Sequence, residues 1–147
     1  MLNAGTKAPE FTLLDDGLNK ISLSDFAGKY VVVYFYPEDD TPGCTKEACA
    51  IRDFFGEFEK QGIVVLGISK DSPESHKKFK EKYHLPFTLL SDPERQVITG
   101  YGAAEGARNK RVSYVIDPHG IIVKTYPNVD PSSHAAEILN DFKSLQN

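Results

Sequence analysis

Hydrophobic residues follow two different periods along the chain, and the order of these patterns predicts alternating strands and helices. Residues 31–36 and 63–69 are continuous runs rich in β-branched and aromatic side chains, which is typical of strands covered on both faces. Between them, residues 42–60 carry apolar positions at helical spacing, with Thr41 as the expected N-cap and Pro42 at the first helical position. We therefore expect a β-α-β unit with parallel strands, in which residues 31–36 form the central strand.

The other segments extend this unit into a mixed sheet flanked by helices. The pattern predicts an N-terminal β-hairpin (11–14 and 20–23), a helix (73–83), a short strand (88–90), a helix that begins at Pro93, two strands around a β-turn (112–116 and 121–126) and a closing amphipathic helix (135–145). Nothing in the sequence marks a linker or a repeat, so we expect one α/β domain over residues 1–147. Its ligand site should lie beyond the carboxyl end of the central strand.

Composition and charge exclude several classes of function. Hydrophobic residues make up 40% of the chain and charged residues 26%, which excludes disordered and low-complexity proteins. The formal net charge of -4 gives no counterion-release contribution to binding a phosphate backbone, so we expect no nucleic-acid partner. The longest apolar run, residues 30–36, is far shorter than the ~20 residues of a membrane helix, and the N-terminus has no apolar secretory stretch. We therefore expect a cytoplasmic protein without membrane association.

The remaining polar motifs predict neither a metal site nor a cofactor site. The glycines of residues 100–106 follow a predicted helix at the wrong spacing for a dinucleotide-binding motif, so this region is interpreted as a loop. The histidines lack the spacing of zinc ligands, and we expect all four to face solvent: His76, His84, His119 and His134.

The two cysteines carry the candidate chemistry. On a helical wheel, the apolar stripe of the 42–60 helix consists of Cys44, Ala48, Ile51, Phe55 and Phe58. Cys49 lies about 140° around the helix from Cys44, so one thiol should face the sheet and the other should largely face away. Helix geometry places their Cα atoms roughly 8–9 Å apart, beyond the ~7 Å limit for a disulfide without backbone movement. The two thiols therefore cannot bond while the helix is intact.

Cys44 stands where a thiolate is favoured over a thiol. It lies in the first helical turn, where the helix dipole and the unpaired N–H groups attract negative charge. Thr41 can bring its hydroxyl to the same place, and Pro37, which has no N–H, can exclude water from a pocket there. The alternative interpretation is that Cys44 is a small hydrophobic residue packed at a helix start.

The segment around Cys44 resembles the active-site segment of the peroxiredoxins. Residues 34–49, YFYPEDDTPGCTKEAC, contain the family's Pro-x-x-x-Thr-x-x-Cys pattern at Pro37, Thr41 and Cys44. The second cysteine, five residues later, is similar to that of the bacterioferritin-comigratory-protein or peroxiredoxin Q branch. Other family landmarks follow in order over essentially the whole chain, at residues 5–11, 66–69 and 86–92. The resemblance implies a thioredoxin-like fold.

The resemblance also implies a role for each residue of the motif. Cys44 would be the peroxidatic residue, Thr41 would hydrogen-bond the reacting atoms and Pro37 would shield the pocket. The arginine before the late strand, Arg111, would lower the pKa of the thiolate and stabilise negative charge on the peroxide oxygens; the alternative is a surface arginine at a strand start. Arg52, on the same helix as Cys44, is a second candidate cation that we interpret as structural.

A reaction sequence follows from this resemblance and from thiol chemistry. The Cys44 thiolate attacks a peroxide oxygen of hydrogen peroxide or an organic hydroperoxide and becomes a sulfenic acid, with which Cys49 condenses to an intramolecular disulfide. Because the intact helix holds the thiols apart, we expect its first turns to unwind in this step. Thioredoxin or a similar dithiol would then reduce the disulfide. The family branch also implies a monomer.

Two other functions fit a fold of this kind. A thiol–disulfide oxidoreductase usually has Cys-x-x-Cys at the helix start and a proline before the facing strand, whereas this chain has four residues between its cysteines and Val112-Ser113 at the strand entrance. A redox-sensing or binding module, in which disulfide formation melts the helix, is the other alternative.

Overall fold

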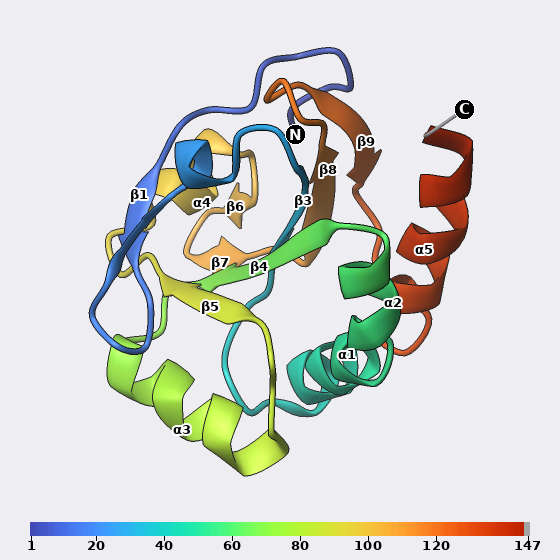
Figure 1. Ribbon diagram of the computed structural model, residues 1–147. Helices are drawn as coiled ribbons and strands as arrows, with labels where there is room; N and C mark the ends of the chain where they lie inside the picture. The colour runs from blue at the N-terminus through green and yellow to red at the C-terminus, as the bar shows by residue number, and fades with distance from the viewer. Residues whose placement is uncertain (146–147) are drawn as a thin grey trace.

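A seven-stranded mixed sheet with helices on both faces forms the body of the computed structural model, which describes residues 1–145 (Figure 1). The strand order is β2-β1-β5-β4-β3-β8-β9, in which β3, β4 and β5 are parallel and the other pairs are antiparallel. The strands are β1 (Thr12–Leu14), β2 (Lys20–Ser22), β3 (Tyr30–Phe35), β4 (Ile63–Ser69), β5 (Thr88–Ser91), β8 (Val112–Ile116) and β9 (Ile122–Tyr126). The helices are η1 (Leu23–Phe26), α1 (Pro42–Asp53), α2 (Phe55–Lys60), α3 (Pro73–Tyr83), α4 (Gln96–Gly100) and α5 (His134–Leu145).

Each face of the sheet has its own apolar core. Alternate residues of β3 point to opposite faces, as the period of a strand requires. Val32 and Tyr34 pack against α1, α2, α3 and α5, whereas Val33 and Phe35 pack against α4, η1 and the N-terminal segment. Figure 1 shows α1, α2, α3 and α5 along one side of the sheet and α4 on the other. The hairpin, the parallel unit and the flanking helices confirm the predicted mixed sheet.

The predicted 42–60 helix is wrong as a single element, because it breaks at Phe54. The backbone of Phe54 leaves the helical region (φ -101, ψ 6), so α1 ends at Asp53 and α2 begins at Phe55. Phe54 is 41% exposed, whereas Phe58 is fully buried under α2.

Two further regions differ from the sequence prediction. The helix expected from Pro93 begins only at Gln96, because Arg95 adopts a left-handed backbone (φ 59) and the carboxylate of Asp92 accepts the N–H of Ile98 at 2.8 Å. The region interpreted as a loop contains a two-stranded ribbon, β6 (Ala104–Glu105) with β7 (Arg108–Asn109).

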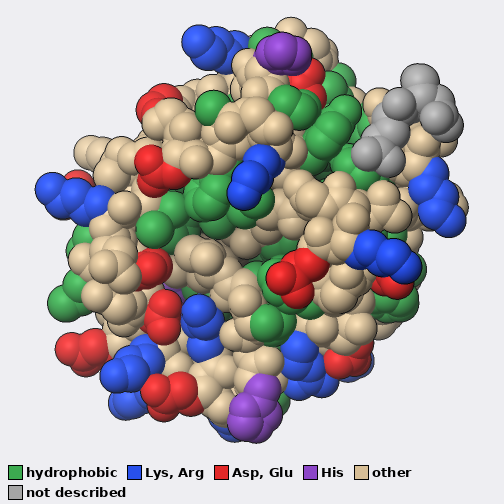
Figure 2. Space-filling view, viewed as in Figure 1, with side chains coloured by type: hydrophobic (Ala, Val, Ile, Leu, Met, Phe, Trp, Pro, Cys, Tyr) green, Lys and Arg blue, Asp and Glu red, His purple; other side chains and the backbone are tan. Residues whose placement is uncertain are grey.

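Figure 2 shows acidic and basic side chains interspersed over the face seen in Figure 1. Within residues 1–145, none of the helices combines the length and the apolar character needed to cross a membrane.

Candidate active site

Strand register brings Arg111 to the helix that carries Cys44. β8 runs antiparallel to β3 with Val112 opposite Phe35, so the start of β8 lies beside the end of β3. The loop after β3 leads into α1, and Cys44 lies in the first turn of that helix, 1% exposed. Arg111 directly precedes β8, and its Nη2 donates a hydrogen bond to Cys44 Sγ at 3.2 Å. Residues 67 positions apart in the chain therefore form one thiol–guanidinium contact.

The same guanidinium also binds a buried carboxylate. Arg111 Nη1 donates to Glu47 Oε1 at 2.7 Å, and Glu47 lies one turn after Cys44 on α1 with no exposed surface. The planar fork of arginine directs a separate nitrogen at each group, whereas a lysine offers a single ammonium nitrogen. Gly43 leaves room for it, because a Cβ at this position would lie 3.0 Å from Arg111 Nη2. The arginine is thus held in place between the thiol and the carboxylate.

Burial and charge compete at this pair. Burial raises the pKa of Glu47 to about 7, although the nearby Arg111 acts in the opposite direction. Partial burial acts to lower the pKa of Arg111, but Glu47 and Cys44 outweigh it and raise that pKa above its usual value. The guanidinium therefore stays charged beside the sulfur, while the carboxyl changes its charge near neutral pH.

Tyr34 lies on the sheet beneath this pair, and its hydroxyl is buried. Burial first, and then the charges of Glu47 and Cys44, raise the pKa of Tyr34 well above its usual value, so the phenol stays neutral. Among residues 1–145, neither the Tyr34 hydroxyl nor Glu47 Oε2 has a hydrogen-bond partner. Both atoms are buried beside Cys44 and Arg111 without a hydrogen-bond partner in the described part of the chain.

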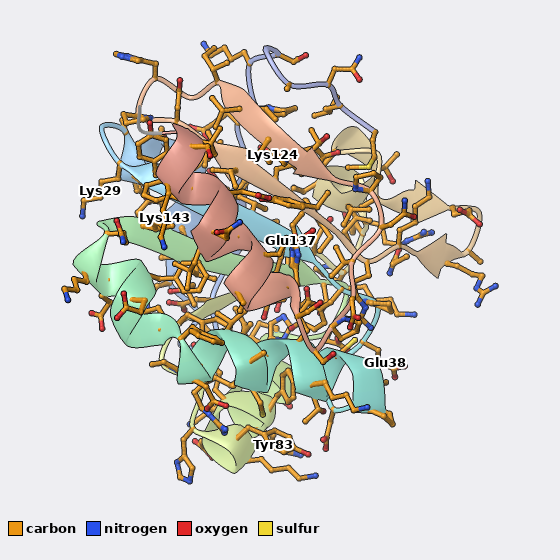
Figure 3. The ribbon with its side chains drawn as sticks, turned by 90° about the vertical axis from the view of Figure 1, so that its right-hand side faces the viewer. Lys29, Glu38, Tyr83, Lys124, Glu137 and Lys143 are labelled. Atoms are coloured by element: carbon orange, nitrogen blue, oxygen red, sulfur yellow. The ribbon has the colours of Figure 1, made fainter. Side chains whose placement is uncertain are left out.

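The structure places Thr41 and Pro37 in the loop before Cys44. Thr41 is the N-cap of α1 and Pro42 begins the helix, as the sequence predicts. The Thr41 hydroxyl does not cap the helix but donates to the carbonyl of Glu38 at 3.2 Å. Figure 3 shows Glu38 beside the N-terminal end of α1. Pro37 follows β3 closely and is partly buried.

Cys49 and Arg52 lie on other faces of α1. Both cysteines are free thiols, and Cys49 is partly exposed, in agreement with its predicted orientation. Arg52 Nη1 donates to the carbonyl of Tyr83 at 2.7 Å, and Arg52 also pairs with Asp53. These contacts tie the last turn of α1 to α3 and agree with the structural interpretation of Arg52.

Two histidines expected to face solvent are instead fully buried. His76 binds Asp39 at 2.7 Å from Nδ1, and His134 binds Ser113 at 2.8 Å from Nε2 and Glu137 at 2.9 Å from Nδ1. Each lies on the same helix face as apolar residues of its own helix, which was the signal available in the sequence. His84 and His119 are exposed, as expected.

Possible ligand atoms for a metal come together around His76. Atoms of Asp39, Asp71 and His76 lie within 4.8 Å of one another. The carboxylate oxygens are already engaged, because Asp39 Oδ2 accepts from Ser75 and Asp71 Oδ2 accepts from Ser69. The protein's own donors therefore satisfy the oxygens that a cation would need.

Comparison with known proteins shows which family the chain belongs to. Residues 4–125 match the AhpC/TSA family. The chain belongs to the AhpC/TSA family. It is 48% identical over 146 residues to a Coxiella burnetii protein assigned as peroxiredoxin bcp, covering 94% of this chain and 97% of that one. The family includes thiol peroxidases of the bcp and peroxiredoxin Q type, to which this peroxiredoxin belongs.

Solved structures give the same assignment. A cysteine-to-serine mutant of Xylella fastidiosa PrxQ superposes with a TM-score of 0.94 at 29% identity, over 100% of this chain and 99% of that one. Xanthomonas campestris bacterioferritin comigratory protein superposes with a TM-score of 0.88 at 30% identity, over 93% and 92% of the two chains. These likenesses confirm the thioredoxin-like fold that the resemblance implied.

Proposed function

We propose that Cys44 is the thiol that reduces the peroxide and that Cys49 resolves the oxidised product. The observation that supports this most strongly is the guanidinium of Arg111, which lies 3.2 Å from Cys44 Sγ while a buried carboxylate fixes its other nitrogen. A cation and a helix start both favour the thiolate, which is the nucleophilic form of the sulfur. Cys49, partly exposed, lies beyond the first turn of the helix.

In the first step, the Cys44 thiolate attacks one oxygen of the peroxide. The S–O bond forms as the O–O bond breaks, so the sulfur is oxidised to a sulfenic acid, and the leaving oxygen takes a proton to become water or an alcohol. Arg111 is placed to stabilise the negative charge that develops on the oxygens. We assign Thr41 to hydrogen-bond the peroxide and Pro37 to keep water from the pocket.

In the second step, the Cys49 thiolate attacks the sulfur of the sulfenic acid. An S–S bond forms, the S–O bond breaks, and hydroxide leaves and is protonated to water. Both cysteines lie within α1, where helix geometry keeps their Cα atoms roughly 8–9 Å apart, so the N-terminal turns of α1 must unwind. The break at Phe54 and the bond from Arg52 to α3 support an unwinding that stops before α2.

The substrates and partners are proposed from the family and from the chain's own chemistry. Alkyl peroxide reduction is described for the Xanthomonas campestris relative, and we propose organic hydroperoxides together with hydrogen peroxide as substrates here. Thioredoxin or a similar dithiol is the proposed reductant, because an intramolecular disulfide is reduced by exchange with a second dithiol. We also propose a monomer, since both required cysteines are in one chain, and a cytoplasmic location, where thiols such as these are kept reduced.

Steady-state turnover with peroxide and thioredoxin tests this proposal in the full chain. The unmodified protein is expected to consume peroxide catalytically. Cys44→Ser should have no activity, whereas Cys49→Ser should react once and then accumulate a sulfenic acid that dimedone traps. Activity retained in Cys44→Ser would contradict the assignment of the reacting thiol, and unchanged turnover in Cys49→Ser would remove Cys49 from the mechanism.

A further inference from the structure

A buried polar network joins the loop before Cys44 to α3, and the reaction described above does not use it. Asp39, in the loop between β3 and α1, has a side chain that is 4% exposed. Its two oxygens accept from the Tyr36 hydroxyl at 2.6 Å and the Ser75 hydroxyl at 2.7 Å, and Oδ2 lies 2.7 Å from Nδ1 of His76. The backbone N–H of Asp39 donates to Asp71 at 2.9 Å. Asp39 is therefore fixed through both its side chain and its backbone.

The contact between His76 and Asp39 is a short hydrogen bond inside the protein. Nε2 of His76 lies 3.0 Å from the carbonyl oxygen of Leu90, which only accepts, so Nε2 carries a proton. Nδ1 faces a carboxylate oxygen of Asp39, so a second proton must lie between them. Losing one partner of such a bond leaves the other buried and unsatisfied, which is costly. Because His76 is fully buried, water cannot replace the contact if one partner is removed.

The loop that Asp39 anchors has a strained backbone next to the candidate active site. Asp40 follows Asp39 with φ 58, a left-handed conformation that non-glycine residues rarely adopt. Such conformations persist where the surroundings fix them. Thr41, the N-cap of α1, comes next, so the position of Asp39 sets where Thr41 and the first turn of α1 begin. Asp40 is also bound by Lys82 and Tyr83 of α3, but this pair is exposed.

We propose that His76 is a positioning residue for peroxide reduction: through Asp39 it holds the Pro37–Thr41 loop so that Thr41 and Cys44 face the same peroxide. This inference rests on the proposed function, since it assigns His76 to the first step of that reaction. His76 does not touch the reacting atoms. It acts through the loop, and displacement of a reacting group by about 1 Å can slow a reaction by about 100-fold.

The test separates the geometry of peroxide attack from the reactivity of the thiol. In a Cys49→Ser parent, stopped-flow measures the second-order rate of Cys44 oxidation by hydrogen peroxide, and iodoacetamide alkylation measures the nucleophilicity of the same sulfur. His76→Gln is expected to slow oxidation about tenfold, as much as loss of the Thr41 hydroxyl would, and to change alkylation less than about threefold, since Arg111 stays beside the sulfur. A residue that only stabilised the fold would not separate the two rates.

Two further variants keep the test decisive. Asp39→Asn retains the size of the side chain but replaces one of its two acceptor oxygens with an NH2 donor, and it should slow oxidation about tenfold. This variant serves as the test if His76→Gln does not fold. Lys82→Gln removes the exposed pair between the same helix and the same loop, and it should stay within about twofold of the parent.

The possible failures are distinguishable. Oxidation of folded His76→Gln or Asp39→Asn at the parent's rate, or an equal loss of oxidation and alkylation, would overturn the positioning role. A Cys49→Ser parent that peroxide does not oxidise would instead overturn the proposed function.

Discussion

Cys44 and Cys49 lie five residues apart on one helix, yet their surroundings differ in almost every respect. Cys44 is buried at the helix start, where it accepts a hydrogen bond from Arg111 and lies one turn from the buried Glu47. Cys49 is partly exposed and lies in the middle of the helix. The more buried thiol is thus the one whose surroundings favour negative charge. Burial alone would make it the less reactive of the two, so the proposed function requires Arg111 and the helix start to favour its thiolate.

Removing Arg111 should have the largest effect on the difference in reactivity between Cys44 and Cys49. Arg111→Ala is expected to slow Cys44 oxidation about 10²- to 10³-fold, because a fixed cation at a developing anion contributes a factor of this size. Arg111→Lys should recover only part of the rate, since one ammonium nitrogen replaces the two nitrogens that bind Glu47 and the sulfur. Stopped-flow oxidation of both variants in the Cys49→Ser background measures this.

Arg52 is the matched control on the same helix. Its guanidinium binds the carbonyl of Tyr83 and the exposed Asp53, on a different face of the helix from Cys44. Arg52→Ala should leave the oxidation rate within about threefold of the parent. Equal losses in Arg52→Ala and Arg111→Ala would show that neither arginine acts on the sulfur directly.

Formation of the disulfide between Cys44 and Cys49 should unwind the first turns of α1 and so remove the helix start that distinguishes the two thiols. In the disulfide form, amide hydrogens in the first turns of α1 are expected to exchange about 100-fold faster than in the dithiol form, because a helix cannot accommodate this disulfide. Amides of α2 should keep their protection, since Phe58 anchors that helix in the core. Full protection of residues 44–49 in the disulfide form would contradict the unwinding.

Glu47, one turn after Cys44, should make the stability of the folded protein depend on pH. Burial raises the pKa of this carboxyl to about 7 in the folded chain, from about 4.5 when it is exposed. Between these two values the folded state binds more protons than the unfolded state, so the stability contributed by Glu47 is lost as the pH rises through this window. Relative to Glu47→Gln, the protein with Glu47 should lose on the order of 2–3 kcal/mol of stability between pH 5 and pH 8.

Urea unfolding at several pH values measures this difference, in a Cys44→Ser background so that the thiol does not titrate. Other ionisable groups are common to the two proteins and cancel in the comparison. A difference that stays constant across the range, or one that grows in favour of Glu47 as the pH rises, would show that Glu47 is an ordinary ionised partner of Arg111.

The smallest expected effect is that of the Thr41 hydroxyl. Thr41→Val keeps the shape of the side chain and removes one hydrogen bond, so oxidation of Cys44 should slow up to about tenfold. Thr41→Ser keeps the hydroxyl and should stay close to the parent rate. Stopped-flow rates that are equal for the valine and serine variants would exclude the hydroxyl from peroxide binding.

Much of the fold could be predicted from local sequence patterns. The apolar runs of β3 and β4 and the Pro42 helix start have strong local signals, and the structure confirms them. The sequence does not predict the break at Phe54, because no proline stands at this position and the apolar spacing continues across it to Phe55 and Phe58. Arg95 delays α4 through a backbone conformation that residue type did not predict.

The candidate site was predicted only in part, for a related reason. Cys44, Thr41 and Pro37 lie in one segment with a recognisable motif, and Arg111 follows from the same family pattern. Glu47 lies on the same side of the helix as Cys44, but the sequence does not show which residue pairs with its charge. Its partner, Arg111, comes close only through the pairing of β8 with β3. His76 was expected on the surface, because the carboxylate that stabilises it lies 37 residues earlier in the chain.

The most direct test is to identify which sulfur is oxidised first. The reduced protein with both cysteines is mixed with less than one equivalent of hydrogen peroxide in the presence of excess dimedone, stopped at successive times, digested and analysed by mass spectrometry. We predict that the earliest dimedone adduct is on Cys44 and that the disulfide with Cys49 replaces it at later times. A first adduct on Cys49, or equal labelling of both sulfurs, would contradict the claim that Arg111 and the helix start make the buried thiol the reactive one.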